Sequence, residues 1–246
     1  MTSRPLPPEW STALERMTDD WLAITGTASH SLVDWSAEFE RMARETQRLK
    51  LAGDWVRGRG DLLFAANRSL DELVHSNILA WLLAPMARHR LGARFLTDLA
   101  AATWGLELAS ADAATIRREV VLESGRRRRI ADLVVQAGPV TLVIENKVCS
   151  PEDEHQCQDL YDLWTDHVEQ AGGSRDDVYF VLLAPHGGPP RTADTDEAKA
   201  RWRPLAYAWV YEWLLRQVDE IPSLVAKSTA IQYLISLRPL VLKGHC

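Results

Sequence analysis

The sequence reads RIADLVVQAGPVTLVIENKV over residues 129–148. Its two apolar runs, residues 130–136 and 140–147, are typical of buried strands, and the Gly138-Pro139 pair between them indicates a break. The second run is apolar on both faces until its last residues. We therefore expect it in the centre of a sheet that is covered on both sides.

The elements around this stretch predict a chain that mixes helices and strands. Residues 115–123 are rich in β-branched side chains and pair with residues 130–136 as a hairpin across Ser124-Gly125. A further buried strand is expected at residues 178–184, and a long exposed loop at residues 186–199. Helices are predicted at residues 8–24, 32–50, 69–84, 92–104, 151–172, 208–218 and 223–237.

The helix near Ser69 has the clearest pattern. Ser69 is expected to cap it, with Glu72 three residues on as the reciprocal partner. Its apolar side chains form one stripe, which predicts the buried face: Leu70, Leu73, Val74, Ile78, Trp81 and Leu82. Glu72, His75 and Ser76 fall on the other side.

Composition limits the classes of protein that the chain can be. With 246 residues and 46% hydrophobic content, it can form one domain with helical additions. The net charge of −6 means that contact with nucleic acid must be local, through a basic patch or a bound cation. No signal core or run of about 18 apolar residues is present, and Cys149, Cys157 and Cys246 form no paired motif. We expect a soluble protein of the reducing cytoplasm, away from membranes.

Three charged residues in the opening stretch need an explanation. Asp132 interrupts a buried run, where an ionised carboxylate is costly without compensation. Glu145 and Lys147 are two residues apart on a strand, so their side chains share a face and Asn146 points away. The alternative is a salt bridge at a strand end.

A metal site is the functional interpretation of these residues. Two carboxylates on neighbouring strands, beside a backbone carbonyl for which Asn146 is the candidate, suit Mg²⁺ or Mn²⁺ better than zinc. A nearby lysine can orient a water molecule or offset phosphate charge. This grouping fits phosphodiester hydrolysis, in which a metal activates water and neutralises developing charge.

The same residues resemble a known family. Residues 129–135 and 142–148 resemble the core of the PD-(D/E)xK nuclease superfamily in motif and in strand order. Residues 71–85 are similar to the N-terminal helix of one bacterial branch, and residues 154–161 to its glutamine and tyrosine signature. The resemblance spans residues 65–240, and it departs at Cys157 and Leu160, where the branch usually has leucine and an aromatic residue.

The resemblance implies a three-layer α/β/α sandwich on a mixed central sheet, with additional N- and C-terminal helices. Residues 65–246 would form this domain, and residues 1–64 a helical extension packed on it. The resemblance also implies Mg²⁺ dependence, with Mn²⁺ as the alternative, and hydrolysis of DNA or RNA. The implied roles are metal ligation by Asp132 and Glu145, a further acidic ligand at the metal site from Glu72, positioning of water by Lys147, and an active-site edge lined by Gln156 and Tyr161.

Other charged side chains have two interpretations each. Arg126, Arg127, Arg128 and Arg129 can hold a phosphate backbone near the site, or can be a solvated turn. His75, His155 and His186 share no spacing that joins them in one site, so structural or surface roles are favoured.

The sequence thus predicts a bacterial, cytoplasmic, metal-dependent nuclease that acts on DNA in preference to RNA, in phage defence or mobile-element biology. Two alternatives stay open: an inactive nucleic-acid-binding or protein-interaction module on the same fold, and a hydrolase of small phosphoesters. A homo-oligomer or a targeting partner protein also stays open.

Overall fold

The computed structural model describes residues 16–17, 19, 35–51, 61–125 and 127–242. The chain divides into two compact units, Met1–Arg48 and Leu49–Cys246. The described part of the first unit is mainly helix α2 (Trp35–Leu51), whose last residues, 49–51, belong to the second unit; the helix predicted at residues 32–50 is confirmed. The helix predicted at residues 8–24 lies outside the described residues, apart from three helical positions. That residues 1–64 pack on the core stays a prediction.

The second unit contains a five-stranded sheet in the order β1-β2-β3-β4-β5. Its strands are β1 (Thr115–Ser124), β2 (Arg127–Ala137), β3 (Val140–Asn146), β4 (Val178–Ala184) and β5 (Trp202–Ala206). The pairs β1–β2 and β2–β3 are antiparallel, whereas β3–β4 and β4–β5 are parallel. The sheet is therefore mixed, and β3 lies at its centre as predicted.

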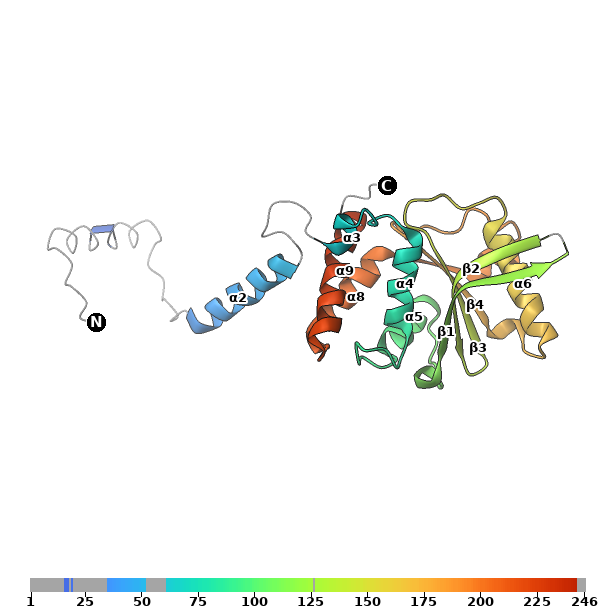
Figure 1. Cartoon of the computed structure of the whole chain (residues 1–246), viewed down its shortest axis with the longest axis horizontal. Coiled ribbons are helices and arrows are strands. Elements are labelled where there is room, and N and C mark those ends of the chain that lie inside the picture. Colours follow the sequence, from blue (N-terminus) through green and yellow to red (C-terminus); the bar gives the residue numbers. More distant parts are fainter. Residues whose placement is uncertain (1–15, 18, 20–34, 52–60, 126, 243–246) are drawn as a thin grey trace. The chain divides into compact units, whose positions relative to one another are not determined.

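Helices cover both faces of this sheet (Figure 1). The helices of this unit are α3 (Leu62–Ala65), α4 (Glu72–Leu83), α5 (Arg94–Trp104), α6 (Gln156–Gln170), α7 (Asp196–Arg201), α8 (Tyr207–Gln217) and α9 (Leu224–Leu242). One hydrophobic core joins α4, α5, α8 and α9 to one face of the sheet, and a second core joins α6 and α7 to the other. The fold is the predicted three-layer α/β/α sandwich.

Strands β2 and β3 separate at one point. Their pairing runs from Ala137–Val140 to Leu133–Ile144, and beyond it β2 continues only beside β1. Strand β3 stays paired with β4 to its end, at Asn146–Leu183. The next residues on the two separating strands are Asp132 and Glu145, so the fold places both carboxylates at a fork in the sheet.

The start of α4 differs from the prediction. Asp71, not Ser69, is the N-cap: its backbone is extended, and its carboxylate accepts from the Val74 N–H at 3.2 Å. Aspartate caps as well as serine does. Glu72 is consequently the first residue of the helix and is free to bond elsewhere.

The predicted buried face of α4 is correct only in part: Leu82 is buried, and Ile78 and Trp81 pack against the core, as predicted. Leu70 and Leu73 are 52% and 53% exposed, whereas His75 and Ser76 are buried. His75 bonds to the Tyr233 hydroxyl and the Ser69 carbonyl, so its polar atoms are satisfied inside the protein. The polar side of α4 can face the protein interior because its buried polar groups have hydrogen-bond partners there.

Three further boundaries differ from prediction. Residues 186–199 are not one loop, since α7 begins at Asp196 and leads directly into β5. Helix α6 begins at Gln156 instead of Pro151, after a left-handed His155 with φ 57°. Helix α9 extends past residue 237 and contains Pro239.

No helix among the described residues is long and apolar enough to cross a membrane. Cys149 is disulfide-bonded, whereas Cys157 is a free and buried thiol. The cysteines therefore give no support to the prediction of a reducing compartment.

Candidate active site

The fork between β2 and β3 brings three predicted residues together. Asp132 lies on β2, Glu145 lies near the end of β3, and Lys147 follows β3 directly. The Lys147 Nζ is 3.0 Å from Glu145 Oε1, and the Lys147 side chain is only 14% exposed. The backbone N–H of Lys147 donates to the Leu183 carbonyl on β4 at 2.8 Å. This bond continues the β3–β4 pairing for one more residue and holds the backbone from which the lysine side chain extends.

The two oxygens of Glu145 have different surroundings. Oε1 accepts from Gln156 Nε2 at 2.5 Å and pairs with Lys147. Oε2 is buried and has no hydrogen-bond partner among the described residues. Because an unsatisfied buried oxygen of this kind is rare and costly, Oε2 needs a partner that the described part of the chain does not supply.

Both carboxyl groups of the fork resist ionisation. Burial, together with the negative charge of Asp132, raises the pKa of Glu145 to about 8. Burial raises the pKa of Asp132 to about 6, although the Asn146 N–H and Lys147 act in the opposite direction. For Lys147, burial lowers the pKa but the charge and hydrogen bond of Glu145 outweigh it, and the net shift is upward. A cation at the fork would favour both ionised carboxylates.

Asp132 also replaces the missing strand pairing. Its Oδ2 accepts from the Asn146 N–H at 2.7 Å, where the β2–β3 ladder has ended. The side chain thereby holds the two separating strands at a fixed spacing. This bond, together with the end of the β2–β3 pairing at this point, explains why the buried strand β2 contains the carboxylate of Asp132.

Glu119 is a neighbour that the sequence did not reveal. It lies on β1 between residues paired with Leu133 and Ala131, and its φ of 50° is in the left-handed region. Its negative charge acts on Asp132 and raises the pKa of that carboxyl. A non-glycine residue in this conformation costs about 1 kcal/mol, which the surrounding strand must offset. An exposed glutamate among charged neighbours carries no sequence signal for this position.

Asn146 points to the opposite face of the sheet, as the strand period predicts. Its Nδ2 donates to Ser76 Oγ at 3.0 Å and to the Glu72 carbonyl at 3.3 Å. Its Oδ1 accepts from the Tyr207 hydroxyl at 2.5 Å. The Asn146 side chain thus joins β3 to α4 and α8, and only its backbone carbonyl is left for the metal-binding role predicted for Asn146.

Glu72 holds the loop that follows β3. Its Oε1 accepts from the Val148 N–H at 2.7 Å, and both of its oxygens accept from the Ser150 hydroxyl, at 2.7 and 2.8 Å. The negative charge of Glu72 raises the pKa values of Asp132 and Glu145, so it lies close enough to act on the site. Glu72 therefore acts on the site through its charge and through its bonds to Val148 and Ser150, and its predicted contact with a metal stays a prediction.

Gln156 and Tyr161, the two site residues predicted on α6, have different roles in the structure. Gln156 is 8% exposed; its side-chain Nε2 donates to Glu145, and its side-chain Oε1 accepts from the Asp153 N–H at 3.0 Å. The Tyr161 hydroxyl instead donates to Glu197 Oε1 on α7 at 2.6 Å. Gln156 is part of the fork, whereas Tyr161 is directed away from it and packs against Phe180.

The predicted arginine cluster is paired with acidic residues. Arg126 lies outside the described residues. Arg127 contacts Asp162 at 2.6 Å, Arg128 contacts Glu123 at 2.8 Å, and Arg129 contacts Asp159 at 2.8 Å. These pairs join β2 to α6 and to β1. Contact of the cluster with nucleic acid stays a prediction.

The donor set fits a hard divalent cation. Asp132 and Glu145 offer carboxylate oxygens from adjacent strands, and Glu145 Oε2 is the buried atom that needs a partner. Oxygen ligands of this kind suit Mg²⁺ and Mn²⁺. Among the described residues, no three His, Cys, Asp or Glu side chains are grouped so that they could hold a metal by themselves. The two carboxylates would need carbonyl or water oxygens to complete a coordination shell.

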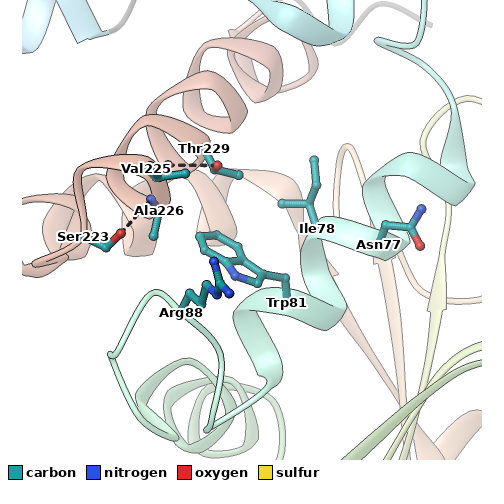
Figure 2. A pocket seen from close by; sticks show the side chains of 8 residues that line it. All are labelled: Asn77, Ile78, Trp81, Arg88, Ser223, Val225, Ala226 and Thr229. Carbon is teal, nitrogen blue, oxygen red and sulfur yellow. Dashed lines mark hydrogen bonds between the residues drawn. The ribbon is translucent and has the colours of Figure 1, made fainter.

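Of the cavities on the described part of this unit, two differ in whether they include a residue of the fork. One, of about 340 Å³, is formed by α4, α9 and Arg88 and is shown in Figure 2; none of its lining residues is acidic. The other, of about 660 Å³, is lined by Lys147 and by the loops after β3 and β4. Only the second adjoins the residues of the fork.

Comparison with known proteins gives one match. The sequence model of the PD-(D/E)XK nuclease superfamily matches residues 61–236, well over half of the chain. No curated protein matches the chain, and neither does any solved structure.

Proposed function

The chain belongs to the PD-(D/E)XK nuclease superfamily, and from that premise we propose that it is a metal-dependent nuclease with Asp132, Glu145 and Lys147 at its active site. The observation that carries the proposal is Glu145 Oε2, a buried carboxylate oxygen without a partner among the described residues, beside a second carboxylate. A salt bridge at a strand end, the alternative, uses Oε1 and leaves Oε2 unexplained.

Asp132 and Glu145 would hold the cation, with Mg²⁺ as the first candidate and Mn²⁺ as the second. When bound, a divalent cation supplies positive charge to a phosphate oxygen and makes a water molecule more acidic. Gln156 fixes Glu145 by bonding to Oε1, so that Oε2 stays available. Glu72 acts as a positioning residue, because its carboxylate holds Val148 and Ser150.

Lys147 would orient the attacking water and offset the charge of the phosphate. Its ammonium is held by Glu145 and is largely buried, so it keeps its position and its charge. Such preorganised charge stabilises the transition state without reorganisation at the moment of reaction.

DNA is the proposed substrate, in preference to RNA, and a bacterial defence or mobile-element role in the cytoplasm is the proposed setting. With a net charge of −6, the protein has no overall attraction for a polyanion. Binding would therefore depend on the cation and on local side chains such as Lys147.

A cleavage assay tests the proposal. Plasmid, linear duplex, single-stranded DNA and RNA are each incubated with the wild type in Mg²⁺, Mn²⁺ or EDTA, alongside Asp132→Ala and Lys147→Ala. We expect cleavage only with metal and a loss of at least a hundredfold in both variants. Arg88→Ala, an exposed arginine at the separate cavity of Figure 2, is the control. Cleavage in EDTA, or equal cleavage by the variants, would refute the proposal.

A further inference from the structure

The cavity beside Lys147 lies on the same face of the sheet as the carboxylates. Glu145 on β3 is paired with Leu182 on β4, and the period of two puts Leu182 and Ala184 on the face of Glu145 and Lys147. Leu182, Ala184 and Lys147 all line the cavity. Adjacent strands are ~5 Å apart, so the cavity begins about one strand spacing from the fork.

The lining combines apolar walls with two flat polar groups. Leu182, Pro185 and Pro189 supply apolar surface, and His186 and Arg191 stand at the loop after β4. Imidazole rings and guanidinium planes stack on unpaired bases, and a guanidinium also binds phosphate. A metal ion or a free phosphate would need none of the apolar surface.

Arg191 keeps its charge available. Its side chain is 75% exposed, and its contact with Glu152 is 3.8 Å long. The Glu152 carboxylate already accepts from the backbone N–H groups of Arg191 and Thr192 and from the Thr192 hydroxyl. The guanidinium is therefore only weakly neutralised at the rim of the cavity.

The wall of the cavity is held at both ends. Gly187 has φ +62°, and a Cβ there would be 2.9 Å from the Ala206 backbone nitrogen, so this glycine lets the loop lie against the end of β5. Glu152 fixes the other end of the loop through Arg191 and Thr192. A preformed cavity of about 660 Å³ is within the size range of sites that bind small organic groups.

We propose that this cavity receives one unpaired nucleotide of the substrate strand, next to the phosphate that lies at Asp132 and Glu145. A paired base inside a duplex is stacked and cannot enter a pocket unless it leaves the helix. The protein consequently prefers single strands, or duplexes with locally unpaired bases. This inference rests on the proposed nuclease function and specifies its substrate.

Binding measurements test the cavity separately from catalysis. Fluorescence anisotropy in Ca²⁺ is used to compare a labelled 12-nucleotide DNA strand, the RNA of the same sequence, and the matching DNA duplex, each with the full chain. We expect the DNA strand to bind about tenfold more tightly than the duplex, as expected for the stacking of one base. The RNA arm shows whether the pocket discriminates the sugar.

Two variants locate the effect. Gly188 lines the cavity and a Cβ there meets nothing within 4 Å, so Gly188→Phe fills space without a backbone clash. Arg191→Ala removes the rim charge but keeps the backbone bonds to Glu152, and Arg88→Ala is its matched control. Both cavity variants should lose most of the tenfold preference for the single strand, and Arg88→Ala should keep it. Thermal melting of each variant verifies that it is folded.

The outcomes separate the two proposals. If the wild type cleaves in Mg²⁺ but binds duplex and single strand equally, or if both folded cavity variants bind as the wild type does, the cavity proposal is wrong and the nuclease proposal stands. If the wild type prefers the single strand through this cavity but does not cleave under any condition, the nuclease proposal fails while the cavity assignment holds.

Discussion

At the scale of single residues, Glu145 explains the most about the site. One of its oxygens is held by Gln156 and Lys147, and the other is buried without a partner among the described residues. The protein thus tolerates a polar atom that reduces its stability. Such tolerance is expected where binding of a cation compensates for it.

The raised pKa of Glu145 leads to a prediction about stability and pH. Between the ordinary value of 4.5 and about 8, the folded metal-free protein keeps a proton on Glu145 that the unfolded chain releases. Stability should therefore fall as the pH rises through this window. Glu145→Gln cannot ionise, so its free energy of unfolding at pH 8 should exceed that of the wild type by about 2 kcal/mol, with little difference near pH 5.

Urea unfolding in EDTA at pH 5 and pH 8 measures this difference. Mg²⁺ should raise the free energy of unfolding of the wild type at pH 8 and leave that of Glu145→Gln unchanged, because only the wild type has two carboxylates that can ionise. Equal stability of the two proteins at pH 8 without metal would contradict the raised pKa of Glu145.

At the scale of elements, α4 supports the site through its first residues. Asp71 caps the helix, and Glu72 holds the loop between β3 and α6. The two carboxylates are adjacent in sequence but bond to different elements. Substitutions at these two residues can therefore distinguish a loss of helix stability from a loss of loop position.

Asp71→Ala and Glu72→Ala make that comparison. Asp71→Ala should reduce the free energy of unfolding by about 1 kcal/mol through the lost cap. Glu72→Ala should cost about 1–3 kcal/mol, because the Val148 N–H and the Ser150 hydroxyl lose their acceptor. Hydrogen exchange should become faster at Val148 and Ser150 in Glu72→Ala alone, and cleavage should fall more in that variant. Equal exchange in both variants would show that Glu72 does not hold the loop.

The elements that could be predicted from the sequence are those that depend on a pattern of neighbouring residues. Strands β2 and β3 follow from their apolar runs, and the spacing of Glu145 and Lys147 follows from the strand period. The burial of His75 and Ser76 on α4 could not be predicted, because His75 depends on Tyr233 and Ser76 on Asn146, which are 158 and 70 residues away. Strand β5 has five residues, one of them Pro204, and pairs only with β4. Its sequence alone therefore gave too little signal.

At the scale of the whole molecule, the described cores come entirely from the second unit. The buried residues of both hydrophobic cores lie between Leu79 and Leu240. The superfamily match begins at residue 61, within the same unit. The fragment Leu49–Cys246 should therefore contain everything that the fold and the site require.

Removal of residues 1–48 tests this division. Differential scanning calorimetry of the fragment Leu49–Cys246 should give a midpoint within about 2 °C of the full chain, since every described residue of the two cores is kept. The fragment should also keep its metal-dependent cleavage. A midpoint lower by about 10 °C would show that the first unit stabilises the second.

The single-turnover cleavage rate as a function of Mn²⁺ concentration, for the wild type and Lys147→Ala, tests the assigned roles most directly. In the proposed site the carboxylates would bind the cation and the lysine would act on the reaction, so the variant should saturate at a similar Mn²⁺ concentration but cleave at least about a hundredfold more slowly. If Lys147→Ala cleaves as fast as the wild type, or if cleavage persists without metal, the assignment of Asp132, Glu145 and Lys147 as a metal-dependent nuclease site is wrong.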